Sequence, residues 1–213
     1  MARNILVVVI AILLVVAGVG LIFAPMLAGP RPDNTWKSVY YGDVDELGAT
    51  WISNKWSCQL TVYSTGAEDS GNVIFVGNGH TDNGKGIIQI ANPQLARFTI
   101  IRPGAYMEQN ADGKLQIVTP QHIYVCDDVH DYCLITAEYN ILGRCFRVWV
   151  LGYSGFASQA GAIYVINCLG SKLRQGGYAV IKYTGVIQAG LSTEDWMNLK
   201  QSDFTYTVVE VLL

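Results

Sequence analysis

The feature that most constrains this chain is an unbroken apolar segment near its amino end. Residues 5–28 carry no ionisable side chain, and Ile5–Phe23 is aliphatic, aromatic or glycine throughout. A helix that spans a bilayer needs about 20 such residues, whereas the apolar core of a signal peptide is usually about 7–15 residues long. The segment therefore predicts a single-pass membrane anchor, with a cleaved signal peptide as the alternative.

The rest of the chain is expected to form one domain on the far side of the membrane. No second long uncharged apolar run follows, which excludes a polytopic membrane protein. Arg3 precedes the apolar segment and Arg31 and Lys37 follow it, so charge gives only a slight guide to orientation. We expect residues 1–29 to be the anchor or signal segment and residues 30–213 to be a single extracytoplasmic domain.

Composition excludes some classes of function. Residues 30–213 hold 13 basic and 17 acidic side chains, a net charge of −4, and no basic cluster. Nucleic-acid binding is therefore not expected, because neutralising phosphates requires many Lys and Arg side chains. The 23 aromatic residues of the chain argue against intrinsic disorder. No cofactor-binding motif is recognised, and we expect no cofactor.

The clearest structural unit lies near the carboxyl end. An apolar strand at 146–151, a helix at 157–173 and a returning strand at 178–183 form a βαβ pattern, which implies a parallel pair of strands. The apolar run 73–76, closed by glycines, predicts a further strand buried on both faces. The fold class is therefore α/β, a mixed sheet with a C-terminal βαβ unit. Because many short strands precede that unit, a mainly-β, pilin-like sandwich is the alternative.

Two glycine-containing loops follow predicted strands and are the candidate ligand-binding sites. Ligands of open α/β sheets favour the carboxyl ends of strands, where backbone N–H groups can approach an anion. The candidate residues are Gly77, Gly79, His80, Asp82 and Asn83 in one loop and Gly152, Ser154 and Gly155 in the other.

An enzyme is the less favoured alternative. Ser154 follows a strand and opens a helix, the setting of a hydrolase nucleophile, but the glycine after it comes one position too early. All three histidines precede Ser154, which is the wrong order for that triad. No catalytic residue is assigned, and His80, Asp82 and Ser154 are the residues to test for an uncharacterised hydrolase.

The segment 126–133 is the densest polar cluster. Asp127, Asp128, His130 and Asp131 are candidate metal ligands, although their spacing matches no standard site. Cys126 and Cys133 are seven positions apart and could close the segment with a disulfide. An acidic turn, bridged or not, is the favoured interpretation.

Three stretches resemble the α/β domains of archaeal surface-layer proteins. They are VIFVGNGHTDN (73–83), FRVWVLGYSGFASQAGAIYVIN (146–167) and the joining segment DYCLITAEYNILGR (131–144). Asn83 matches a family Asn, whereas Gly79 replaces a proline and Ser158 a threonine. The resemblance implies an α/β envelope domain without a known catalytic centre.

The leading hypothesis is a membrane-anchored extracytoplasmic domain with a non-enzymatic envelope, assembly or protein-interaction role. Residues 5–28 would hold it in the membrane, and protein partners or self-assembly are expected. The alternative is a small-ligand-binding or sensor module that uses the loops after 73–76 and 146–151. A pocket at those loops would favour the second hypothesis, and exposed apolar area would favour the first.

Overall fold

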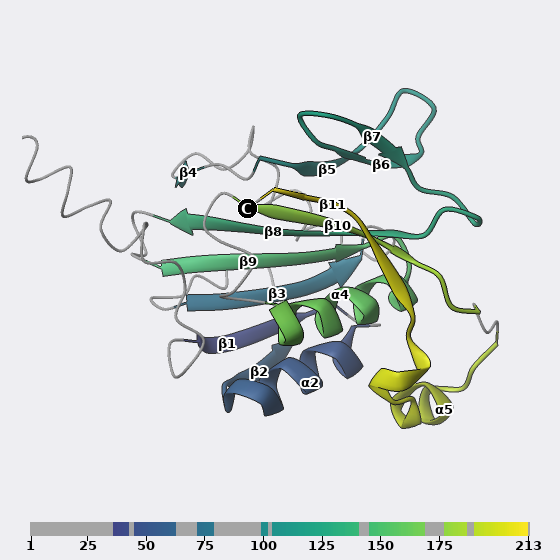
Figure 1. Cartoon of the computed structure of the whole chain (residues 1–213). Helices are drawn as coiled ribbons and strands as arrows, with labels where there is room; N and C mark the ends of the chain where they lie inside the picture. Colours follow the sequence, from purple (N-terminus) through teal and green to yellow (C-terminus); the bar gives the residue numbers. More distant parts are fainter. Residues whose placement is uncertain are drawn as a thin grey trace, which may run out of the picture.

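A seven-stranded path of paired strands, with an eighth strand beside it, forms the large central sheet of this computed structural model. Residues 36–42, 45–62, 72–78, 99–101, 104–140, 145–168, 177–186 and 190–212 are described. The strand order is β11-β10-β8-β9-β3-β1-β2, and β4 pairs with β8 off this path. Helices α2 and α4 cover one face, and a small sheet covers the other (Figure 1).

One half of the large sheet is parallel and the other half antiparallel. The parallel half consists of β2 (Gln59–Val62), β1 (Trp36–Tyr41), β3 (Asn72–Asn78) and β9 (Cys145–Gly152). The antiparallel half adds β8 (Tyr132–Asn140), β10 (Tyr178–Tyr183), β11 (Tyr206–Leu212) and the short β4 (Thr99–Ile101). The sheet is mixed, as the sequence predicts.

The second sheet is a three-stranded meander of β5 (Tyr106–Gln109), β6 (Leu115–Val118) and β7 (Ile123–Val125). Residues 110–113 form the β5–β6 connection, and their sequence Asn-Ala-Asp-Gly is typical of a turn. The Asn110 side chain accepts hydrogen bonds from the N–H groups of Asp112 (3.0 Å) and Lys114 (2.9 Å), and Gly113 supplies a φ of 76°.

Two cores lie on the two faces of the large sheet. The helix-side core includes Val39, Ile74, Val150 and Ile181. The core under the small sheet includes stacked rings, with Phe75 4.2 Å from Trp149 and 5.3 Å from Tyr40 between ring centroids. Adjacent strand residues alternate between these cores, as expected for a sheet covered on both faces.

Helix α4 (Gly155–Cys168) is the central helix of the domain. Residues 157–165 are all buried, and the helix has neither acidic side chains in its first turn nor basic ones in its last. A helix that is apolar on every side must be covered on every side. Helix α2 (Glu46–Trp56) provides part of that cover, because a Cβ on Gly48 would lie 2.8 Å from Cβ of Ala162.

The predicted βαβ unit is present, but its two strands are not neighbours. β9, α4 and β10 follow one another, and β9 and β10 run in the same direction. β8 lies between them and pairs antiparallel with both. The expectation that β9 and β10 pair directly with each other is therefore wrong. In the β8–β9 hairpin, β8 occupies the edge of β9 at which β10 would otherwise pair. Helix α4 is about 21 Å long at 1.5 Å per residue, so it carries the chain past this intervening strand.

A parallel βαβ unit with adjacent strands occurs instead at the start of the domain. β1, α2 and β2 form it, and β1 pairs with β2 in parallel. Helix α2 has Glu46 in its first turn and Lys55 in its last, both favourable toward the helix dipole. It ends at Ser57, whose left-handed φ of 53° stops the helix. The sequence analysis did not identify this helix.

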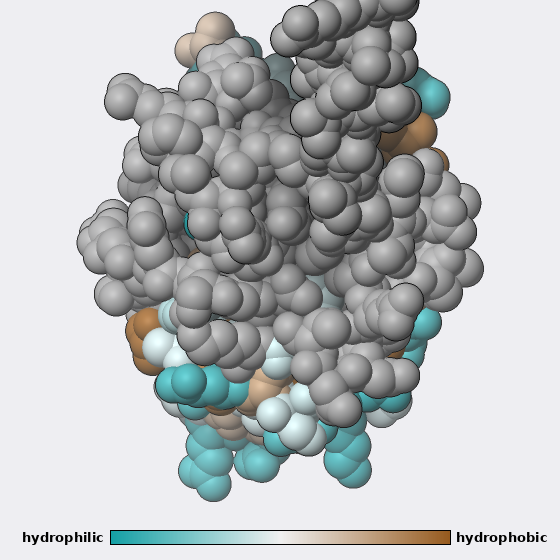
Figure 2. Space-filling model, turned by 90° about the vertical axis from the view of Figure 1, so that its left-hand side faces the viewer, coloured by the Kyte–Doolittle hydropathy of each residue, from teal (hydrophilic) through white to brown (hydrophobic). Residues whose placement is uncertain are grey.

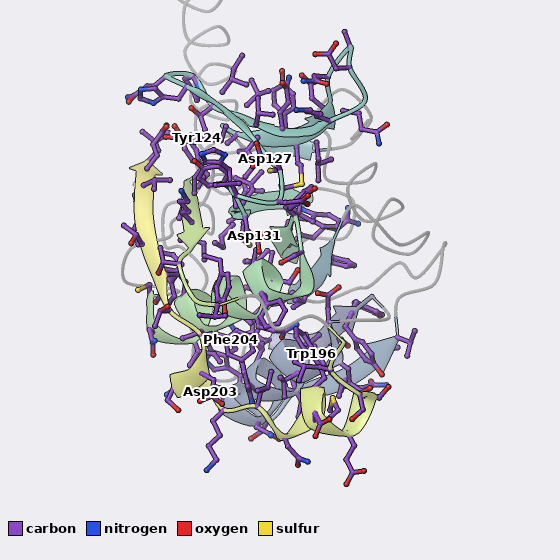
Figure 3. The ribbon with its side chains drawn as sticks, turned by 90° about the vertical axis from the view of Figure 1, so that its right-hand side faces the viewer. Tyr124, Asp127, Asp131, Trp196, Asp203 and Phe204 are labelled. Carbon is purple, nitrogen blue, oxygen red and sulfur yellow. The ribbon has the colours of Figure 1, made fainter. Side chains whose placement is uncertain are left out.

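A short helix and a 3-10 turn precede the last strand. Helix α5 (Thr193–Asn198) is capped by the Ser192 hydroxyl, which accepts from the N–H of Asp195 (3.1 Å). A 3-10 turn, η1 (Gln201–Asp203), follows. Trp196 and the buried Phe204 pack around Phe156 of α4 at 4.9 and 6.0 Å between ring centroids (Figure 3). These aromatic contacts hold this segment against the helical layer.

Residues 5–28, the predicted anchor, lie outside the described residues. Within the described part of the chain, no helix is both long and apolar enough to span a membrane. Figure 2 shows the domain from the end at which the parallel strands begin, where hydrophilic side chains of the described residues gather along the lower rim. The anchor therefore stays a prediction.

Candidate functional site

The two predicted loops follow strands that end side by side. β3 and β9 pair in parallel, with Gly77 opposite Leu151 and Asn78 opposite Gly152. The carboxyl ends of two parallel strands therefore meet at one edge of the sheet, as the sequence predicts. Gly79, His80, Asp82 and Asn83 lie outside the described residues, so their binding role stays a prediction.

Gly152 lets α4 begin close to the end of β9. A Cβ at this position would clash with the backbone nitrogen and hydroxyl of Ser158, and would lie 2.7 Å from the Ser154 carbonyl oxygen. The Ser158 hydroxyl in turn donates to the Gly77 carbonyl oxygen (3.2 Å). The glycine is thus required by packing between strand and helix.

Ser154 is the N-cap of α4. Its hydroxyl oxygen accepts a hydrogen bond from the N–H of Ala157 (3.2 Å), three residues on, as N-cap serines do. The same hydroxyl donates to Asp131 Oδ2, and the Ser154 N–H donates to Asp131 Oδ1 (3.2 Å). This is the arrangement of a helix cap, with the hydroxyl engaged on both sides.

Asp131 is the buried carboxyl group at the centre of this end of the sheet (Figure 3). It is 3% exposed. Burial raises its pKa, and the two hydrogen bonds from Ser154 lower it by less. The carboxyl group therefore stabilises the protein less when it is ionised.

The neighbouring acidic turn is held by its own hydrogen bonds. Asp127 Oδ1 accepts from the N–H groups of Val129 (2.9 Å) and His130 (2.8 Å), and His130 Nδ1 lies 2.9 Å away. These bonds keep the pKa of Asp127 below its ordinary value. Asp131 points instead to Ser154. Within the described residues, no three His, Cys, Asp or Glu side chains converge as metal ligands. The structure thus places Asp127 and His130 in one set of contacts and Asp131 in another.

The possible disulfide between Cys126 and Cys133 is not formed in the structure. Both are free, buried thiols. Cys126 belongs to the core under the small sheet and Cys133 to the core under the helices, where a Cβ on Gly161 would lie 2.5 Å from its sulfur. The two sulfurs therefore lie on opposite sides of the large sheet, and a bridge would need the strand to turn over.

A cavity of about 390 Å³ opens beside this turn. Its walls come from the β5–β6 turn, the segment before β8 and the residue after Gly152. The lining residues are Gln109, Gly113, Lys114, Leu115, Cys126, Asp127, Asp128 and Tyr153. The cavity joins two segments singled out in the sequence, the loop after 146–151 and the acidic segment 126–133. The β5–β6 turn, which supplies the other wall, carried no such signal.

The electrostatic environment of the cavity is predominantly negative. Burial raises the pKa of Tyr153, and the nearby carboxylates of Asp128, Asp127 and Asp131 raise it further. Burial also raises the pKa of the Cys126 thiol to about 12, so it is a protonated, apolar part of the wall. Lys114 supplies a positive charge at the rim.

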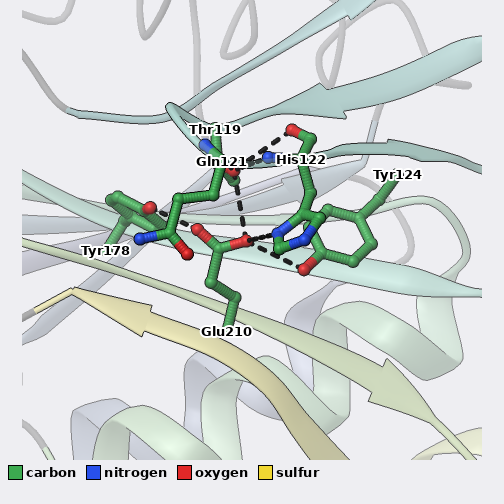
Figure 4. Close-up of polar contacts among 6 residues, drawn as sticks. All are labelled: Thr119, Gln121, His122, Tyr124, Tyr178 and Glu210. Atoms are coloured by element: carbon green, nitrogen blue, oxygen red, sulfur yellow. Dashed lines mark hydrogen bonds and ion pairs between the residues drawn. The ribbon is translucent and has the colours of Figure 1, made fainter.

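A second polar cluster, which we call the Glu210 cluster, ties β11 to the small sheet (Figure 4). Glu210 Oε2 accepts from Thr119 Oγ1 (3.1 Å), His122 Nδ1 (3.0 Å) and Tyr124 OH (2.8 Å). Its Oε1 accepts from Tyr178 OH. The carboxylate side chain is only 9% exposed. One carboxylate thus joins three elements that are distant in the sequence.

The hydrogen bonds of the Glu210 cluster favour the ionised form of Glu210. Burial raises its pKa, but the bonds from Tyr178, His122, Tyr124 and Thr119 together lower it more. Burial first, and then the bonds to Glu210, raise the pKa values of Tyr124 and Tyr178 to about 12, so both phenols remain donors. Sequence reasoning missed this cluster, although a lone Glu in the run Val-Val-Glu-Val was a visible signal.

Comparison of the chain with family models, curated proteins and solved structures found no match. The functional argument therefore rests on the residues and the geometry described above.

Proposed function

We propose that this chain is a membrane-anchored extracytoplasmic module that binds a small ligand. The observation that carries the proposal is the cavity of about 390 Å³ at the carboxyl edge of the sheet. Its volume falls within the range of about 300–1,000 Å³ that is typical of small-molecule sites. One lining residue, Tyr153, follows the carboxyl end of β9, and ligands of open α/β sheets bind at that edge.

The chemistry of the walls also supports a binding role. A few polar groups, including Lys114, Asp127 and Asp128, share the lining with the apolar Leu115 and Cys126. Small-molecule sites combine these two kinds of surface, because the apolar part contributes affinity and the polar part fixes orientation.

A ligand screen on the full chain in detergent tests this proposal. Thermal-shift or NMR hits should weaken in Asp128→Lys, which reverses a rim charge, and should survive in Glu194→Lys, an exposed change on α5. If every hit binds both variants equally well, the cavity is not the site and the proposal fails.

Protein interaction or assembly in the cell envelope is the second candidate function. It is favoured by exposed apolar side chains on two strands that the Glu210 cluster holds together, β7 and β11; they are Ile123, Val125, Val208, Val209 and Leu212. Both strands are edges of their sheets, and exposed apolar area is typical of interaction surfaces. The resemblance to surface-layer domains agrees with this role.

Light scattering of the full chain tests the second candidate. Self-assembly through this surface should be weakened by Ile123→Lys together with Val208→Lys, and unchanged by Val186→Lys, an exposed apolar position in the loop after β10. Identical particle sizes for all three proteins would contradict assembly through β7 and β11.

A further inference from the structure

The cavity carries charges of both signs from different elements. Lys114 follows the β5–β6 turn, and Asp127 and Asp128 follow β7. The N–H of Cys126 donates to the carbonyl oxygen of Leu115 (2.9 Å), which continues the antiparallel pairing beyond the strands and sets the two charged segments beside each other. Among the described residues, the structure records no ion pair between Lys114 and either aspartate.

One of these charges is fixed in position. Three hydrogen bonds within the turn, two from backbone N–H groups and one involving the His130 ring, all reach Asp127 Oδ1. They keep the carboxylate ionised and oriented, and among the described contacts they leave Oδ2 without a partner. A carboxylate held in this way needs little reorganisation to receive a ligand's ammonium group.

Apolar side chains form part of the lining, which we call the apolar base. Leu115 is 7% exposed and Cys126 is 1% exposed. The Cys126 thiol stays protonated at neutral pH, since its pKa is raised to about 12. The Tyr153 ring adds an aromatic wall. This surface suits an aliphatic or aromatic side chain placed between the two charged groups.

From this arrangement we propose that the cavity binds a free α-amino acid with an apolar side chain. The inference rests on the proposed function and gives it a ligand class. The ligand's ammonium group meets Asp127 and Asp128, its carboxylate meets Lys114, and its side chain lies on Leu115, Cys126 and Tyr153. A sugar would leave the apolar base uncovered, and a simple anion or cation would use only one of the two charged rims.

The test uses the full chain in detergent and four probes, measured by calorimetry. L-phenylalanine carries both charges, phenethylamine lacks the carboxylate, 3-phenylpropionate lacks the ammonium group, and D-glucose lacks both. We expect L-phenylalanine to bind at least tenfold more tightly than any other probe, since loss of one charged contact in a partly exposed site is worth about 1.4 kcal/mol, a factor of ten.

Two variants assign the charges. Lys114→Met should weaken L-phenylalanine about tenfold and leave phenethylamine unchanged. Asp128→Asn, chosen because Asp127 also holds the turn together, should weaken L-phenylalanine and phenethylamine and leave 3-phenylpropionate unchanged. Lys55→Met on α2 is the matched control and should change nothing.

The outcomes separate the two proposals. Equal affinity for L-phenylalanine and phenethylamine, or tightest binding of glucose, overturns the amino-acid inference while a ligand site at the cavity stands. If none of the probes and no member of a general small-molecule library binds the cavity, both proposals are overturned.

Discussion

Replacing Glu210 with glutamine should destabilise the domain, because one carboxylate accepts four hydrogen bonds that join β11, β10 and the small sheet. Glu210→Gln keeps the size and shape of the side chain and one carbonyl oxygen, and it removes the charge. The change therefore measures what the ionised group contributes.

The magnitude follows from the contacts. Three donors, Thr119, His122 and Tyr124, reach Oε2, and the glutamine oxygen can keep all three. Each becomes a bond to a neutral acceptor, which is worth roughly half of a charge-assisted bond, a loss of about 0.5–1 kcal/mol per bond. The Tyr178 hydroxyl can rotate to accept from the new amide. The expected loss in free energy of unfolding is about 2 kcal/mol.

Urea unfolding of the wild type and of Glu210→Gln at pH 7 measures this loss as a lower midpoint at unchanged slope. The folded-state pKa of Glu210 is lowered, so its contribution is present above the unfolded-state pKa of about 4.3 and is lost as pH falls through the folded-state value. The difference in stability between the two proteins should therefore be smaller when the experiment is repeated at pH 3.5.

Glu194→Gln is the matched control, because Glu194 is exposed on α5; it should cost less than about 0.5 kcal/mol. Equal midpoints for wild type and Glu210→Gln at pH 7 would refute the reasoning. So would a difference that persists unchanged at pH 3.5, since it could not come from the charge.

Three further changes follow from the contacts described above, each measured by the same urea unfolding unless stated. Asp131→Asn should nearly preserve stability at pH 7, whereas Asp131→Ala should lose about 2 kcal/mol because the Ser154 contacts are lost. Because the folded-state pKa of Asp131 is raised, the wild type should lose stability relative to Asp131→Asn as pH rises through that value. A difference in stability that stays constant with pH would contradict this. Gly152→Ala should cost about 3 kcal/mol, since backbone atoms of Ser158 and Ser154 stand in the way of the Cβ, and an unchanged midpoint would show that the helix start can shift. In mass spectrometry of protein unfolded without reductant, Cys126 and Cys133 should both be alkylated, and their protection until reduction would restore the disulfide.

The sequence predicted three strands of the large sheet, at 73–76, 146–151 and 178–183, within a few residues. Apolar runs bounded by glycines mark β3 and β9, and the strand β10 has the predicted bounds. These signals are local, because they depend on alternation, turn residues and caps. The predicted helix at 157–173 is confirmed over residues 157–168, and residues 169–173 lie outside the described residues.

What failed depends on contacts between distant segments. A strand pattern does not name its partner, so β8 between β9 and β10 could not be foreseen. Helix α2 contains Gly48, Thr50 and Trp51, which are modest helix formers, and its formation depends on packing against α4. The possible Cys126–Cys133 bridge was inferred from the separation of the two residues along the chain. Whether it can form depends on the face of the sheet to which each side chain points.

The cavity and the Glu210 cluster were also beyond the sequence. Glu210 meets partners that precede it by 32 to 91 residues, and no spacing rule relates such positions. The cavity is a space between a turn and a strand end. The sequence pointed in advance only to the acidic segment 126–133 and to the glycine-containing loop after 146–151, which form parts of its walls.

The shared direction of β1, β3 and β9 has a consequence for how the domain stands in a cell. Trp36 starts β1 at the end opposite the cavity, about 26 Å away along the eight residues of β9. If residues 5–28 cross a membrane, residues 29–35 allow at most about 25 Å of reach between bilayer and domain. The cavity then faces the surrounding medium while the base of the sheet sits close to the lipid. The cavity would take up its ligand from the surrounding medium. A signal that the ligand is bound would have to pass along the full length of the parallel strands to reach the membrane.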